Sequence, residues 1–222
     1  MAKKIVAVFG GTGYTGRFVV RELLRREIRP VAIARHPAAF AAAGFADSEV
    51  ECRQATVDDP VALDQALYEA QAVINCAGPF VDTADATVSA ALRAGIHYVD
   101  VAAEQISVAR TLEQFDKPAH TAGVVVVPSM AYFGGLSDLM ATAVLEDWDR
   151  VDSIEVMNGF DSWHPTLGTR NTIARKSVGN LMVTGGRLTE VPSPPAQKRW
   201  SFAEPIGDQA VIELPLAETV LN

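Results

Sequence analysis

Residues 4–24 read KIVAVFGGTGYTGRFVVRELL, and this stretch decides the fold. The run from Lys4 to Phe9 is short, largely apolar and without alternation, which is typical of a strand buried on both faces of a parallel sheet. Three glycines follow at a spacing of three, namely Gly10, Gly13 and Gly16. Apolar residues then recur at helical spacing, so the sequence predicts that the glycines lie where a strand turns into a helix.

The glycine-rich turn predicts a site for a phosphate group. Glycine has no Cβ and lets another group approach the backbone closely. The first amides of the following helix lack intrahelical acceptors, and the positive end of the helix dipole lies behind them. The spacing GxxGxxG differs from the commoner GxGxxG of dinucleotide folds, but the glycines serve the same purposes. Because strand, turn and amphipathic helix occur together, we expect a dinucleotide cofactor here rather than a turn without a ligand.

Composition narrows the class of protein. The chain has 222 residues, of which 49% are hydrophobic and 21% charged, as in a globular protein with one large or two modest domains. Its net charge of -8 argues against a general nucleic-acid binder. Two cysteines, Cys52 and Cys76, and four scattered histidines show no metal-ligand spacing, so we propose no metal site.

The N-terminus gives no sign of targeting. It runs straight into the first strand without an apolar signal region, and no apolar run reaches the length that spans a membrane. We therefore expect a cytoplasmic protein without a transmembrane segment.

A second apolar run, residues 30–35, ends on Arg35 about twenty residues past the last glycine. NAD-preferring sites usually carry an acidic residue at this position, whereas an arginine accommodates the 2′-phosphate of NADP. A phosphate beside Arg35 gains charge-assisted hydrogen bonds on the order of 1.5 to 3 kcal/mol each. The position therefore predicts NADP rather than NAD; the alternative is a surface arginine that ends a strand. Arg17, just after the third glycine, is a second candidate partner.

Two aspartates follow the expected third strand, residues 50–55. Asp59 precedes Pro60 in the manner of a helix N-cap. Asp58 has two interpretations that stay open, a contact with the adenine amino group or an acid at a helix start.

The fourth apolar run and its exit loop read AVINCAGPF, residues 72–80. In an open α/β sheet, ligands lie beyond the carboxyl ends of the strands. We therefore expect Asn75, Ala77, Gly78 and Pro79 to border the cofactor. Cys76 is expected to pack as a small hydrophobe, because the sequence places no base beside it.

The alternation of strands and helices continues to residue 128. We expect a helix that begins at Asp82 or Thr83 and ends before Gly95, a strand over residues 96–104, a helix over residues 105–120 stopped by Gly123, and a strand over residues 124–128. Six such alternations with short links predict an α/β fold with a doubly wound parallel Rossmann sheet. We assign residues 1–149 to this dinucleotide-binding domain, including a helix over residues 137–148.

The pattern changes in residues 150–222, which we assign to a smaller, incomplete α+β domain for substrate binding or dimerisation. Residues 151–160 alternate apolar and polar positions, as a half-exposed strand does. A loop, a helix and short β-like pieces follow. Trp163 and Trp200 leave two alternatives open: an interface for a homodimer through this domain, or core that an incomplete domain leaves uncovered.

Three motifs in this order, VFGGTGYTGR, INCAGPF and HYVDVAAE, resemble the saccharopine dehydrogenase-like family of NADP-binding oxidoreductases. The resemblance covers roughly residues 4–127 and is weaker through GTRNTIARKSVG. In that family the glycine loop binds the pyrophosphate and the loop after the fourth strand lies by the nicotinamide. The resemblance also implies a longer chain, because members usually continue past residue 222. The implied pyrophosphate contacts are Gly10, Thr12, Gly13, Tyr14, Thr15 and Gly16, and the implied nicotinamide contacts are Asn75, Ala77, Gly78 and Pro79.

The leading hypothesis is an NADP-dependent oxidoreductase that transfers a hydride between the nicotinamide and a small organic substrate held between the two domains. A short-chain dehydrogenase is disfavoured, because no tyrosine is followed by lysine four positions later. His97 is expected to be a packed histidine rather than a catalytic acid, since it stands among apolar strand residues.

Polar residues after the fifth and sixth strands are candidates for the substrate side, where a tyrosine or carboxylate can relay a proton. Each also has a structural interpretation that we favour: a core aromatic for Tyr98, a loop-stabilising acceptor for Asp100 and a helix cap for Asp138. The substrate-side candidates are Tyr98, Asp100, Glu104, Tyr132 and Asp138.

A second hypothesis is a non-catalytic regulator that senses the redox state of NADP. The absence of a recognisable catalytic signature motivates it. Such a regulator requires different affinities for NADP and NADPH, because ligands that bind both states equally cannot shift a switch.

Overall fold

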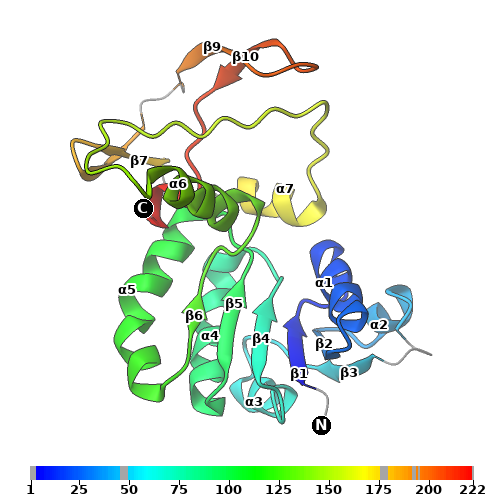
Figure 1. Ribbon diagram of the computed structural model, residues 1–222. Helices are drawn as coiled ribbons and strands as arrows, with labels where there is room; N and C mark the ends of the chain where they lie inside the picture. The colour runs from blue at the N-terminus through cyan, green and yellow to red at the C-terminus, as the bar shows by residue number, and fades with distance from the viewer. Residues whose placement is uncertain (1–3, 46–49, 176–179, 192–193, 195, 222) are drawn as a thin grey trace.

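The structure is a computed structural model that describes residues 4–45, 50–175, 180–191, 194 and 196–221. Its centre is a six-stranded parallel sheet with the strand order β3-β2-β1-β4-β5-β6 (Figure 1). The strands are β1 (Ile5–Phe9), β2 (Arg29–Ala34), β3 (Glu51–Gln54), β4 (Ala72–Asn75), β5 (His97–Asp100) and β6 (Val126–Val127). This order, with β1 in the interior, is that of the expected Rossmann sheet.

Helices cover both faces of the sheet. They are α1 (Tyr14–Arg25), α2 (Ala38–Ala42), α3 (Pro60–Ala66), α4 (Phe80–Ala94) and α5 (Gln105–Ala122). Successive residues of β1 enter different clusters: Phe9 packs with Leu63 of α3 and Val88 of α4, whereas Val8 packs with Val20 of α1. A strand buried on both faces in this way explains the unbroken apolar run in the sequence. The doubly wound α/β fold is confirmed.

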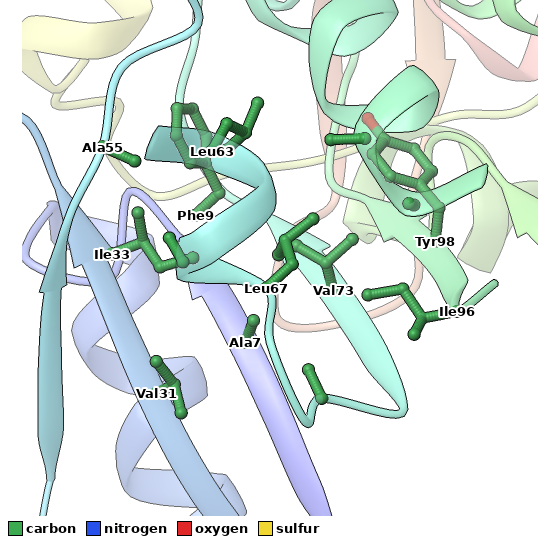
Figure 2. Close-up of a cluster of buried hydrophobic side chains, with 14 of the residues drawn as sticks. Ala7, Phe9, Val31, Ile33, Ala55, Leu63, Leu67, Val73, Ile96 and Tyr98 are labelled. Carbon is green, nitrogen blue, oxygen red and sulfur yellow. The ribbon is translucent and has the colours of Figure 1, made fainter. Parts of the chain in front are cut away.

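The larger cluster lies between the sheet and helices α3 and α4 (Figure 2). Leu63, Leu67 and Val73 are almost completely buried in it. Each side chain of this size contributes about 1.5 to 3 kcal/mol on burial. Tyr98 completes one end of the cluster, and its hydroxyl points away from Val73 and Ile96 (Figure 2).

The helix ends follow the sequence at several points. The Asp59 side chain accepts a hydrogen bond from the amide of Ala62 at 3.0 Å, which confirms it as the N-cap of α3. Gly95 and Gly123 end α4 and α5, as expected. However, α4 begins at Phe80 rather than at Asp82 or Thr83, because a distant side chain, that of Glu104, accepts hydrogen bonds from its first amides.

The start of β5 also differs from expectation. His97 is exposed rather than packed, since it lies at the amino end of the strand, away from the edge where the strands exit. Its Nδ1 accepts a hydrogen bond from the amide of Val125 at 3.0 Å. This bond diverts one amide of the expected sixth strand, so the ladder includes only Val126 and Val127.

The chain after β6 lies beyond the carboxyl ends of the strands, and we refer to it as the second unit (Figure 1). The domain boundary expected after residue 149 stays a prediction. It contains a turn η1 (Tyr132–Leu136), helices α6 (Ser137–Leu145), α7 (Leu167–Ala174) and α8 (Glu218–Leu221), and the strands β7 (Leu181–Thr184), β8 (Arg187–Glu190), β9 (Gln197–Ser201) and β10 (Asp208–Ile212). The strands form two separate antiparallel pairs, β7 with β8 and β9 with β10.

The strand expected over residues 151–160 is wrong. This segment has no regular structure, because none of the described strands pairs with it. Apolar and polar residues alternate here in the sequence, but the apolar residues Ile154 and Phe160 are both exposed. Trp163 and Trp200 are 63% and 37% exposed, so neither is core here, and the homodimer interface stays a prediction.

The second unit is joined to the sheet domain by polar and apolar contacts. The Gln105 side chain donates to the carbonyl of Leu181 at 2.7 Å and to that of Leu216 at 3.0 Å, and it accepts from the amide of Leu181 at 2.8 Å. Ala217 is buried against Phe80 and Val108. Among the helices within the described ranges, none has the length and apolar character needed to cross a membrane.

Candidate cofactor site

The site is built on the turn between β1 and α1. The amide of Gly10 donates to the carbonyl of Ile33 at 2.9 Å, which ties the turn to β2. Gly10 has φ +75°, and a Cβ at this position would lie 2.9 Å from the Cβ of Ala77. Only glycine combines this backbone angle with so close an approach. The turn therefore lies directly against the exit loop of β4.

Gly16 lets helix α1 lie against the same turn. A Cβ on Gly16 would be 2.2 Å from the carbonyl oxygen of Gly10. The amides of Tyr14, Thr15 and Gly16 form the first turn of α1, where no intrahelical acceptor exists. Tyr14 and Thr15 are exposed, so these amides lie at the open side of the turn. The arrangement is an anion site of the kind that holds a pyrophosphate.

Arg17 provides a second sign of an anion. Its Nε is buried and has no hydrogen-bond partner among the residues that the structure describes. It stands in the N-terminal turn of α1, where the helix dipole disfavours a cation. Arg25 and Arg26 on the same helix, by contrast, both pair with Glu22. A bound phosphate would satisfy the Nε and offset the dipole, so these residues fit a phosphorylated cofactor.

Arg35 and Asp58 lie on the surface. Arg35 directly follows β2, its side chain is exposed, and no described residue holds it in an ion pair. Its carbonyl accepts a hydrogen bond from the side chain of Gln54 at 3.0 Å, which fixes the backbone of this position. Asp58 is exposed in the turn that leads into α3. Both side chains are therefore free to contact a ligand, and both roles stay predictions.

The exit loop of β4 is fixed by Asn75, which is completely buried. Its Oδ1 accepts from the amide of Ala77 at 3.0 Å, and its Nδ2 donates to the hydroxyls of Thr83 and Tyr98, each at 3.2 Å. The hydroxyl of Thr83 donates to the carbonyl of Ala77 at 2.6 Å. Both backbone groups of Ala77 are thus held. Gly78 and Pro79, the next two residues, leave the sheet at the carboxyl end of β4, next to α7.

Two of the substrate-side candidates are inside the protein. Tyr98 and Asp100 are both 0% exposed. The Tyr98 hydroxyl donates to Oδ2 of Asp100 at 2.8 Å, and Oδ1 accepts from the amides of Ala102 and Ser129 at 2.9 and 2.7 Å. These contacts support the structural interpretations, a core aromatic and a loop-stabilising acceptor. Both side chains are buried and hydrogen-bonded to the protein, and their place on the substrate side stays a prediction.

Burial also sets the ionisation of this pair. The pKa of Asp100 is raised above its usual value, first by desolvation and further by the charge of Glu104, against the lowering effect of its hydrogen bonds. The pKa of Tyr98 is raised well above its usual value by desolvation and by the charge of Asp100. Tyr98 therefore stays protonated at neutral pH and acts as a hydrogen-bond donor.

Glu104 is used by the fold rather than left free for a substrate. Its carboxylate accepts hydrogen bonds from the amides of Phe80 at 2.9 Å and Val81 at 3.0 Å, and from the hydroxyl of Thr172 at 3.1 Å. Arg175 forms an ion pair with Asp82. Helix α7 is thereby held over the start of α4, beside Gly78.

The remaining substrate-side candidates lie in the second unit. Tyr132, in the turn η1, is exposed, and its ring packs edge-on against Phe133 and close to Phe160. Asp138 stands in the first turn of α6, where its charge is favourable. The cap position of α6 is Leu136 and no side-chain cap bond is formed there, so the expected helix cap at Asp138 is wrong. The substrate-side roles of Tyr132 and Asp138 stay predictions.

Cys76 packs against the hydrophobic cluster that contains Val8 and Val20, as expected. Burial and the charge of Asp100 raise the pKa of its thiol to about 12, so it is not a nucleophile at neutral pH. No group of three or more metal-ligating side chains occurs within the described ranges.

Sequence reasoning missed three residues of this region: Thr83, Ser129 and Thr172. Ser129 is the first polar residue after the sixth strand, and the rule that sites lie at carboxyl ends of strands could have singled it out. Thr83 and Thr172 had no such signal, since they meet their partners only through the packing of α4 and α7.

Comparisons with known proteins identify the family of this chain. A family model described as the saccharopine dehydrogenase NADP binding domain matches residues 6–127. The human saccharopine dehydrogenase-like oxidoreductase is 25% identical over 154 residues, which cover 60% of this chain and 35% of that protein. A lipid droplet localized protein of Caenorhabditis elegans is 24% identical over 196 residues, which cover 78% of this chain and 45% of that protein. The chain thus spans less than half the length of these relatives.

Among solved structures, the apo saccharopine dehydrogenase (L-Glu forming) of Saccharomyces cerevisiae matches with a TM-score of 0.53. It is 18% identical, and the match covers 66% of this chain and 31% of that chain. At this identity the likeness shows the fold alone. The matching family model is that of an NADP-binding domain and spans more than half of the chain. The cofactor is therefore NADP, and this protein belongs to the saccharopine dehydrogenase family.

Proposed function

We propose that this protein is an NADP-dependent oxidoreductase that transfers a hydride between the nicotinamide and a small organic substrate. The observation that carries the proposal is the glycine turn, whose first-turn amides have no intrahelical acceptor, together with Arg17 of the same helix turn, whose buried Nε has no hydrogen-bond partner among the described residues. The relatives bear the name oxidoreductase, which supports the same class of reaction.

Different residues of this chain bind different parts of the cofactor. The amides that follow Gly13 hold the pyrophosphate, and Arg17 neutralises part of its charge. Arg35 binds the 2′-phosphate, and the adenine lies toward Asp58. The loop from Asn75 to Pro79 borders the nicotinamide. The bound cofactor supplies the hydride chemistry, and the protein supplies position and electrostatics.

The substrate side lies between this loop and the second unit. Helix α7 lies beside Gly78, as a Cβ built on Gly78 would be 3.7 Å from the hydroxyl of Thr172 in this helix. Tyr132 and Asp138 follow β6 at the same edge of the sheet. Tyr132 is exposed and carries an ionisable hydroxyl, so it is our candidate for the proton that accompanies hydride transfer. The cytoplasmic location stays a prediction from the sequence.

The test is a titration of the protein with NADPH and with NADH, repeated on Arg35→Ala. We expect micromolar or tighter binding of NADPH, a marked preference over NADH, and loss of that preference in the variant. Arg21→Ala, an exposed arginine on α1, is the matched control and should keep the preference. Absence of binding of either nucleotide to the unmodified protein would overturn the proposal. A preference that survives in Arg35→Ala would remove Arg35 from the site.

A further inference from the structure

A buried chain of hydrogen bonds crosses the carboxyl ends of β4, β5 and β6. It runs from Nδ2 of Asn75 to the hydroxyl of Tyr98, from that hydroxyl to Asp100, and from Asp100 to the amide of Ser129. All four residues are 0% exposed. Polar groups buried this completely are costly unless each one is paired. The chain of bonds satisfies them and ends at the loop that borders the nicotinamide.

The direction of each bond follows from Asp100. An ionised carboxylate only accepts hydrogen bonds, and Oδ1 already accepts two from backbone amides. The Tyr98 hydroxyl must therefore donate to Oδ2, which leaves its oxygen to accept from Asn75. The amide group of Asn75 then has one orientation, with Nδ2 toward Tyr98 and Oδ1 toward the amide of Ala77.

Thr83 holds the same loop from helix α4. Its hydroxyl accepts from Nδ2 of Asn75 and donates to the carbonyl of Ala77 at 2.6 Å. Both the amide and the carbonyl of Ala77 are thus fixed by side chains that share one hydrogen-bond network with Tyr98 and Asp100. The Cβ of Ala77 lies only 2.9 Å from the point where a Cβ on Gly10 would be. The position of Ala77 therefore affects the glycine turn as well.

We propose that Tyr98 and Asp100 are positioning residues, which set the nicotinamide-side loop through the orientation of Asn75 and do not touch the substrate. The inference rests on the proposed function, in that it takes the loop after β4 as the border of the nicotinamide. Asp100 satisfies the buried amides of Ala102 and Ser129, and its other oxygen connects through Tyr98 to Asn75. Two bonds of this network, from the amide of Ala77 to Asn75 and from Thr83 to the carbonyl of Ala77, fix the backbone of Ala77.

The test compares two ligands that differ only in the nicotinamide ring, namely NADPH and 2′-phospho-ADP-ribose, on Tyr98→Phe. The substitution keeps the ring and removes the hydroxyl, so the Nδ2 of Asn75 loses one of the two hydroxyls to which it donates. We expect the Kd of NADPH to rise about five- to tenfold, as for the loss of one buried hydrogen bond, while the Kd of 2′-phospho-ADP-ribose stays unchanged. Tyr68→Phe is the matched control, since Tyr68 is exposed, and both Kd values should stay unchanged.

Thr83→Val is a second variant that leaves the core tyrosine in place. It removes the hydroxyl that holds the carbonyl of Ala77, and we expect the same selective loss of NADPH affinity. If both variants fold and the ratio of the two Kd values stays that of the unmodified protein, the positioning role is wrong. If the unmodified protein binds neither ligand, the proposed function itself fails, which is a separate outcome of the same experiment.

Discussion

The Oε1 atom of Glu104, at the start of α5, lies 2.9 Å from the amide nitrogen of Phe80 at the start of α4. The other carboxylate oxygen accepts from the amide of Val81 at 3.0 Å. One acid thus caps a helix that has no local side-chain cap. Removing it by Glu104→Ala leaves two amides without acceptors, and we expect the free energy of unfolding to fall by about 1 to 3 kcal/mol.

Chemical denaturation with urea measures this loss. Glu113→Ala, at an exposed position of α5, is the control and should change the free energy of unfolding by less than about 0.5 kcal/mol. Equal effects of the two substitutions would contradict the capping role of Glu104.

Gly16→Ala tests the contact between α1 and the glycine turn. The new Cβ would be 2.2 Å from the carbonyl oxygen of Gly10, and no backbone-preserving position relieves this clash. We expect a loss of at least about 2 kcal/mol in stability together with loss of NADPH binding. Gly168→Ala, where the nearest atom outside the neighbouring residues is 3.6 Å away, should keep both properties. Calorimetry of each variant, with and without NADPH, gives both results.

Arg17→Met should have opposite effects on stability and on binding. In the free protein the substitution removes a cation from the positive end of α1 and a buried Nε for which the described part of the chain offers no acceptor. The melting temperature should therefore rise, by the equivalent of about 0.3 to 1 kcal/mol. The Kd of NADPH should rise about five- to tenfold, because one charge-assisted hydrogen bond is lost. A variant that is less stable than the unmodified protein in the absence of ligand would show that Arg17 has a structural partner instead.

The thiol of Cys76 should react slowly with alkylating reagents. With a pKa of about 12 in place of 9.0, its thiolate fraction at pH 8 falls by about 1000-fold, and the rate of reaction with iodoacetamide should fall with it. The measurement uses Cys52→Ser, so that a single thiol remains, and mass spectrometry of the alkylated product. The same chain unfolded in urea provides the reference rate. A similar rate for the folded and unfolded chains would mean that the thiol is not desolvated.

Asp100 should make stability depend on pH in the acid range. Its pKa is raised in the folded protein above the ordinary 3.8, so between these two values the folded state binds more protons than the unfolded state. The contribution of this carboxyl to the free energy of unfolding therefore falls as the pH rises through that interval and is constant above it. We expect the difference between the unmodified protein and Asp100→Asn to show this decline in urea titrations from about pH 3.5 to about pH 7. A difference that increases with pH across the interval would contradict the raised pKa.

The sheet domain could be predicted from the sequence because its signals are local. The apolar run before Gly10, the cap at Asp59 and the stops at Gly95 and Gly123 each depend on a few consecutive residues. The predicted ends of helices and strands are wrong where a contact with a residue distant in the sequence determines them. Glu104 moves the start of α4 to Phe80, and His97 shortens β6, although neither contact is visible in the local pattern.

The candidate site also has parts that local sequence predicts and parts that depend on packing between distant residues. The glycine turn and Arg35 follow from motif and spacing, whereas the burial of Tyr98 and Asp100 depends on how α4 and the exit loops cover the strand ends. Polar residues after a strand indicated the right region but not their role. The alternation in residues 151–160 failed for a related reason, since a strand needs a partner that the local sequence does not specify.

Gln105 contacts the second unit through main-chain atoms, the amide and carbonyl of Leu181 and the carbonyl of Leu216. Every residue type except proline at position 181 offers these same groups. Mutations at positions 181 and 216 can therefore accumulate over evolutionary time without losing this attachment. A descendant of this protein can acquire new side chains at these two positions while it inherits the sheet domain and the junction unchanged.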